Sequence, residues 1–136
     1  MTLLDIVLIQ HMDTGLNLFE YRQETTQFNS DHSDIFSGFL AAIQNISKEL
    51  DIGTVVLIST EGTKGHNCII IPKYPISIIM LVDQEDPIQV WRETGQLIAQ
   101  EFLKKYGNDF DYINIAQFKD FSNYLKEICS QHNYCE

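Results

Sequence analysis

Four apolar runs constrain the fold of this chain more than any other feature of its sequence. All four are rich in the β-branched residues that favour strands. Their apolar residues are nearly continuous rather than alternating, so we expect strands that are buried on both faces. A sheet of this kind needs helices on both of its sides. The runs are Leu3–Met12 (LLDIVLIQHM), Thr54–Thr60 (TVVLIST), Cys68–Pro72 (CIIIP) and Ile76–Val82 (ISIIMLV).

The segments between the first two runs predict an edge strand and a helix. Leu16–Arg22 (LNLFEYR) is more mixed in polarity, which is typical of a strand at the edge of a sheet. Ser33 or Asp34 is expected to cap a helix that ends near Leu50. Small residues at 38, 41 and 42 predict a close approach of this helix to the sheet. Its apolar stripe at helical spacing is formed by Ile35, Phe39, Ile43, Ile46 and Leu50, and is widened by Phe36 and Leu40.

Two further helices are predicted after the last apolar run. Asp86-Pro87 is a good N-cap followed by Pro at the first helical position, and this helix ends at Tyr106-Gly107. The next spans about 115–130, where Asn114 and Gln117 resemble a capping box. The order is thus β-β-α-β-β-β-α-α, an α+β fold. We expect one domain over residues 1–130 and a short tail over 131–136.

Charge and composition exclude several classes of function. The net charge is −10, with 19 acidic residues against nine Lys and Arg, so the chain lacks the basic surface that nucleic acid or anionic lipid requires. No apolar run approaches the roughly 20 residues of a membrane span, and the N-terminus does not read as a signal peptide. Three cysteines do not form a secreted disulfide framework. We expect a cytoplasmic protein.

The tripeptide Asp13-Thr14-Gly15 matches the active-site signature of aspartic proteases. Those enzymes need two carboxylates that share a proton, so one copy per chain would require a homodimer. They are almost entirely β, whereas more than a third of this chain is predicted to be helical. We therefore interpret the tripeptide as a hairpin turn, in which Asp13 makes an Asx-type bond to its own turn.

No other motif predicts catalysis, a cofactor or a metal. Gly62–Gly65 (GTKG) lacks the spacing of a phosphate-binding loop and precedes a strand, so it is interpreted as a hairpin tip. Cys129, His132 and Cys135 could supply three metal ligands, but no fourth ligand is evident at a structural spacing. We therefore predict no catalytic, cofactor-binding or metal site.

Two stretches carry a resemblance to a known family. The hairpin DIVLIQHMDTGLNLFEYR (5–22) and the helix start SGFLAAI (37–43) are similar to stand-alone longin-like proteins, including archaeal ones. Longin domains belong to the profilin-like group, together with roadblock proteins. The resemblance covers residues 3–129. Roadblock proteins begin with a helix before the first strand, and this chain does not; it also lacks the coiled coil and membrane anchor of SNARE-type longins.

The resemblance implies a five-stranded antiparallel sheet with one helix on one face and two on the other. It further implies a non-enzymatic interaction module in a small-GTPase-regulating or vesicle-trafficking assembly. Partners would be a small GTPase or another longin or roadblock subunit, in a homodimer or heterodimer. Such a protein would reach membranes only through its partners. The alternatives are a roadblock-like GTPase-regulating dimer and a small-molecule sensor of the PAS or GAF type.

Candidate interface residues follow from the two predicted elements nearest the N-terminus. Strand edges pair with other chains, and aromatic residues anchor interfaces. This predicts contacts through Leu18, Phe19 and Tyr21 on the edge strand, unless these residues pack under a helix. Gln44 and Lys48 on the polar face of the first helix are weaker candidates, since such a face is ordinarily solvated.

Overall fold

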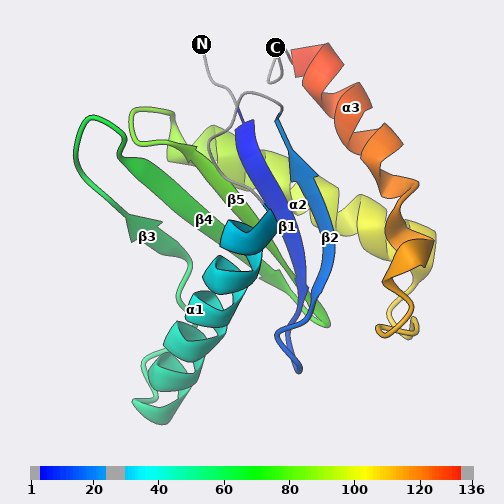
Figure 1. Cartoon of the computed structure of the whole chain (residues 1–136), viewed down its shortest axis with the longest axis horizontal. Coiled ribbons are helices and arrows are strands. Elements are labelled where there is room, and N and C mark those ends of the chain that lie inside the picture. Colours follow the sequence, from blue (N-terminus) through cyan, green and yellow to red (C-terminus); the bar gives the residue numbers. More distant parts are fainter. Residues whose placement is uncertain (1–3, 24–29, 133–136) are drawn as a thin grey trace.

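The structure is a computed structural model that describes residues 4–23 and 30–132. Its centre is a five-stranded antiparallel sheet in the order β2-β1-β5-β4-β3 (Figure 1). The α+β class and the order of elements are confirmed, and β2 and β3 form the two edges. The strands are β1 (Leu4–His11), β2 (Asn17–Arg22), β3 (Leu57–Ser59), β4 (His66–Lys73) and β5 (Ile76–Asp83).

Helices cover both faces of this sheet. The helix α1 (Ser30–Glu49) crosses one face diagonally, and α2 (Ile88–Tyr106) lies behind the other (Figure 1). The short 3-10 helix η1 (Ile115–Phe118) and the helix α3 (Phe121–His132) complete the layer on the α2 side. The arrangement implied by the resemblance, with one helix on one face and two on the other, is confirmed.

The two faces differ in the size of their hydrophobic cores. On the α2 side, Trp91, Phe102, Phe118 and Phe121 are buried against the sheet. At Gly95 a Cβ atom would overlap the side chains of β4 and β5, so this glycine allows α2 to approach the sheet closely. The core on the α1 side is much smaller and consists of Ile6, Leu8, Leu40, Cys68, Ile70 and Ile79. The helix α1 therefore covers its face only in part.

Helix boundaries differ from the sequence prediction in three places. The helix α1 begins at Ser30, four residues before the predicted start. Pro87 is the N-cap of α2, while the Asp86 carboxylate accepts a hydrogen bond of 3.2 Å from the Trp91 indole. The predicted third helix is divided into η1 and α3. Its capping box does not form, because the Gln117 amide donates instead to the backbone oxygens of residues 111 and 114.

The turn that contains Asp13 joins β1 to β2. Gly15 has a φ of 74°, which favours glycine, and its N–H donates to the His11 oxygen at 2.8 Å. The predicted Asx-type bond is wrong, because the Asp13 carboxylate accepts a hydrogen bond of 2.8 Å from the Tyr74 hydroxyl. Within the turn it is Thr14 Oγ1 that accepts a backbone hydrogen bond, from the N–H of Leu16. This hydrogen bond and the nearby carboxylate charge raise the pKa of Tyr74.

Candidate functional site

Polar contacts at the N-terminal half of α1 fix how this helix is rotated about its axis. Ser33 is buried, and its hydroxyl donates to the Glu20 carboxylate on β2. Arg22 pairs with Glu20 at 2.6 Å and donates to Ser33 Oγ at 3.3 Å. One turn further along, the Ser37 backbone oxygen accepts a hydrogen bond of 3.2 Å from the buried Gln10 amide on β1. The face that carries residues 33 and 37 is thus held against the sheet.

The C-terminal half of α1 is held by the same face. The Gln44 amide donates to the Val55 oxygen at 2.8 Å and accepts from the Val55 N–H at 3.0 Å. The Ser47 hydroxyl donates to the Gly53 oxygen. Residues 33, 37, 40, 44 and 47 follow helical spacing, so they form one continuous inner face. Turning α1 about its axis would break every one of these contacts.

The most apolar face of α1 consequently points away from the protein. The stripe predicted from the sequence lies largely on this outer face, since Ile35 is 71% exposed, Phe39 50%, Ile46 59% and Leu50 63%, whereas Leu40 on the inner face is 1% exposed. The predicted close approach through Gly38 is wrong as well, because no atom lies within 4 Å of where its Cβ would be. Exposed apolar surface of this extent is characteristic of interaction sites in proteins.

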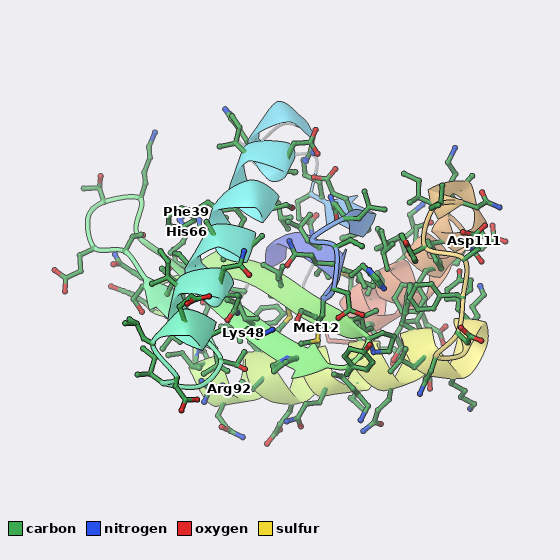
Figure 2. The ribbon with its side chains drawn as sticks, turned by 90° about the horizontal axis from the view of Figure 1, so that it is seen from below. Met12, Phe39, Lys48, His66, Arg92 and Asp111 are labelled. Carbon is green, nitrogen blue, oxygen red and sulfur yellow. The ribbon has the colours of Figure 1, made fainter. Side chains whose placement is uncertain are left out.

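Beside the N-terminal half of α1, a groove of about 750 Å³ opens onto the sheet. Its floor consists of apolar residues from β1, β3, β4 and β5, and Phe36 and Phe39 of α1 form one wall. Phe39 and His66, both labelled in Figure 2, line this groove. The groove exists because α1 does not extend over the parts of β3 and β4 that lie next to the β3–β4 loop (Figure 1). It continues the outer apolar face of α1 onto the sheet.

One lysine and two histidines lie at the rim of the groove in an otherwise acidic protein. Among the described residues that line it, the charged or imidazole side chains are those of His32, Lys64 and His66, and none is acidic. Cys68 lies in its floor, where burial raises the pKa of the thiol to about 12, so the sulfur stays protonated at neutral pH. The groove therefore suits an apolar group, with Lys64 as the one cation among the described residues that line it.

A second hollow, of about 570 Å³, lies between the C-terminal half of α1 and the β1–β2 turn. It is lined by polar residues of both charges, including Asp13, Lys48 and Asp51. Lys48 and Met12, both labelled in Figure 2, line this hollow from its two sides, α1 and the β1–β2 turn. Its mixed lining lacks both the apolar surface and the single charge sign of the groove, so the groove is the stronger candidate site.

The five residues proposed from the sequence lie in three different settings. Leu18 and Phe19 are buried, and Phe19 packs edge-on against Phe121 with ring centroids 5.5 Å apart. Tyr21 is half-buried against the same core. Gln44 tethers α1 to the segment before β3, and Lys48 is exposed. The structure thus matches the alternative that the aromatic residues of β2 pack under a helix, and only Lys48 lies openly on the surface.

Several other features bear on metals and membranes. In the described part of the chain, no group of three His, Cys, Asp or Glu side chains could hold a metal ion. Cys129 is disulfide-bonded, while the His132 side chain and Cys135 lie outside what the structure describes. Within residues 4–23 and 30–132, no helix has both the length and the apolar character to cross a membrane.

Comparison with known proteins places the fold. A roadblock/LC7 domain from Streptomyces avermitilis is similar with a TM-score of 0.58 and 12% identity, over 76% of this chain and 84% of that one. Myxococcus xanthus MglB is similar with a TM-score of 0.54 and 14% identity, over 76% and 83%. No family model and no curated protein sequence matches the chain. At these identities the likeness shows the fold, which is the one shared by roadblock and longin-like domains.

Proposed function

We propose that this protein is a non-enzymatic interaction module that works as a subunit or adaptor of a small-GTPase-regulating assembly. Its partner chain, a small GTPase or another roadblock or longin subunit, docks on the outer face of α1. A vesicle-trafficking assembly is the alternative setting implied by the longin resemblance. The protein acts in the cytoplasm and reaches membranes only through its partners.

The orientation of α1 is the observation that carries this proposal. The serines and the glutamine of α1 face the sheet, whereas Ile35, Phe39 and Ile46 face solvent. A helix with this orientation loses hydrophobic stabilisation as a monomer. Covering those side chains with another chain recovers it. The adjoining groove and the free edge of β3 extend the same surface, and sheet edges accept strands from other chains.

The test is affinity capture from the native lysate with the tagged protein, in the presence of GDP or a GTP analogue. We expect recovery of a small GTPase or of a roadblock or longin chain. The variant Phe39→Ser should lose this partner, whereas the matched variant Leu97→Ser should keep it, because Leu97 is about equally exposed but lies on α2. Equal recovery by both variants would contradict docking on α1, and recovery of no partner would contradict the proposed function.

A small-molecule sensor is the second candidate, and the groove of about 750 Å³ is the observation that favours it, because this volume suits a small ligand. Native mass spectrometry of the freshly purified protein separates the two functions. A bound compound of fixed mass that is lost in the variant Cys68→Trp would support a sensor. An unliganded chain would support the interaction module.

A further inference from the structure

We propose that the second hollow, between α1 and the β1–β2 turn, binds a free basic amino acid such as lysine or arginine. This inference goes beyond the proposed function and does not depend on it. The residues of α1 that line the hollow are not those of its outer apolar face; they are Ala41, Gln44, Asn45 and Lys48.

The floor of the hollow contains a pair of buried polar residues. On the α1 side of the sheet, Leu8 of β1 pairs with Ile79 of β5, and both belong to the small core. The next pair on the same face is Gln10 with Ser77, and both of these residues line the hollow. Gln10 is 6% exposed and Ser77 is 7% exposed. The sheet thus changes from apolar to polar at a place where its side chains are still buried.

The Ser77 hydroxyl is the observation that points to a ligand. Although Ser77 is buried, its hydroxyl forms no hydrogen bond with any residue that the structure describes. Gln10 differs, because its amide nitrogen donates to the backbone oxygens of Gly15 and Ser37, both at 3.2 Å. Its amide oxygen is left as an acceptor at the floor. A buried hydroxyl without a partner costs free energy, and a ligand that hydrogen-bonds to it offsets that cost.

The walls of the hollow carry three charged side chains, two acidic and one basic. Asp13 lies on the β1–β2 turn, Lys48 lies on α1, and Asp51 follows the end of that helix. None of the three forms a salt bridge within the described part of the chain. The Tyr74 hydroxyl donates to the Asp13 carboxylate at 2.8 Å, which holds this carboxylate in place beside the hollow.

A ligand that complements these charges carries two cationic groups and one carboxylate. Free lysine and arginine have this composition at neutral pH, because the α-ammonium and the side chain are cationic and the α-carboxyl is ionised. The two cations pair with Asp13 and Asp51, and the carboxylate pairs with Lys48. Remaining N–H groups donate to the Ser77 hydroxyl and the Gln10 oxygen. The volume of about 570 Å³ lies within the range of small-molecule sites.

The test is a titration of the isotope-labelled full chain with L-lysine and L-arginine, followed by NMR at constant pH and ionic strength. We expect saturable chemical-shift changes, centred on Ser77 and the β1–β2 turn, with a Kd of about 1 mM or lower for at least one of them. Three relatives of lysine each lack one charged group. Nα-acetyl-lysine lacks the α-ammonium, norleucine the side-chain ammonium and cadaverine the carboxylate. Each should bind about tenfold more weakly or worse, because one charge of the protein then has no partner.

Substitutions distinguish the hollow from the rest of the surface. Lys48→Met and Asp13→Asn should each raise the Kd for the amino acid about tenfold, and Ser77→Ala should raise it about threefold, since a neutral hydrogen bond contributes less than a charged one. Lys104→Met and Asp109→Asn remove the same charges from exposed positions outside the hollow. These two controls should leave the Kd unchanged.

Three results would overturn the inference. The first is the absence of saturable shift changes with either amino acid up to about 10 mM. The second is binding of any of the three relatives as tightly as lysine, and the third is an equal loss of binding in the control variants. Phe39→Ser, on the outer face of α1, should bind the amino acid normally. Partner capture that needs Phe39, together with no amino-acid binding, would therefore refute this inference and leave the proposed function standing.

Discussion

Leu40 and Ile46 lie on opposite faces of α1, and shortening each to alanine tests how this helix is rotated. Leu40 is 1% exposed and packs in the small core over β1 and β4, whereas Ile46 is 59% exposed. Leu40→Ala should destabilise the protein by about 3 kcal/mol, since the loss of buried methylenes and the cavity left behind both contribute. Ile46→Ala should cost about 1 kcal/mol or less, because less than half of the side chain is buried.

The assay is denaturation by guanidinium chloride, followed by circular dichroism at a protein concentration low enough to keep the chain monomeric. Equal costs for the two variants at low concentration would refute the reasoning. They would mean that the stripe predicted from the sequence, rather than the serine-bearing face, packs on the sheet.

Three further predictions concern two helix glycines, the buried Cys68 and the hydrogen bond of Tyr74. In the same denaturation assay, Gly95→Ala should lower the free energy of unfolding by about 2 kcal/mol, because the added methyl group overpacks against the sheet. Gly38 lies on the open face of α1, so Gly38→Ala should leave the free energy of unfolding unchanged or raise it by up to about 1 kcal/mol. Cys68 should resist alkylation at pH 8 in the folded protein and react once the protein is unfolded, because burial raises the pKa of its thiol to about 12. Mass spectrometry measures the alkylation, and rapid alkylation of the native chain would contradict the burial of Cys68. The pKa of Tyr74 should fall towards the ordinary tyrosine value in Asp13→Asn, in a titration followed by NMR, and an unchanged pKa would show that the carboxylate does not hold the hydroxyl.

The architecture was predictable because most of the apolar runs are strands covered on both sides, as Ile76–Val82 is, and such a sheet needs helices on two faces. The run Thr54–Thr60 did not follow this expectation, since it forms only the short, partly exposed edge strand β3 (Leu57–Ser59). Helix ends were less accurate, since they depend on single hydrogen bonds. Asp86, for example, precedes the N-cap Pro87, and its carboxylate accepts a hydrogen bond from the Trp91 indole.

The candidate site was missed because periodicity does not say which face of a helix is buried. On α1 the apolar face and the polar face both repeat at helical spacing, and hydrophobicity selects the wrong one. What decides is tertiary hydrogen bonding, through partners as distant in sequence as Gln10 and Val55. The spacing of Ser33, Ser37 and Ser47 opposite an Ile and Phe stripe is the signal that could have revealed an outward apolar face.

The aromatic residues of β2 illustrate the same limit. Phe19 was a reasonable interface anchor for an exposed edge strand, but its side chain is buried and packs against Phe121 of α3. Whether a side chain on an edge strand is exposed depends on where later helices pack, and the sequence of the strand does not contain that information. The strands β2 and β3 both remain edges of the sheet.

The most direct test of the outward apolar face is photo-crosslinking in the native cell. A photoreactive phenylalanine derivative at Phe39 preserves the shape of the side chain, and the same derivative at Gln100, exposed on α2, is the control. If the outer face of α1 is an interaction surface, position 39 will form abundant crosslinks to another protein chain, identified by mass spectrometry, and position 100 will not. Equal and sparse crosslinking at both positions would contradict it.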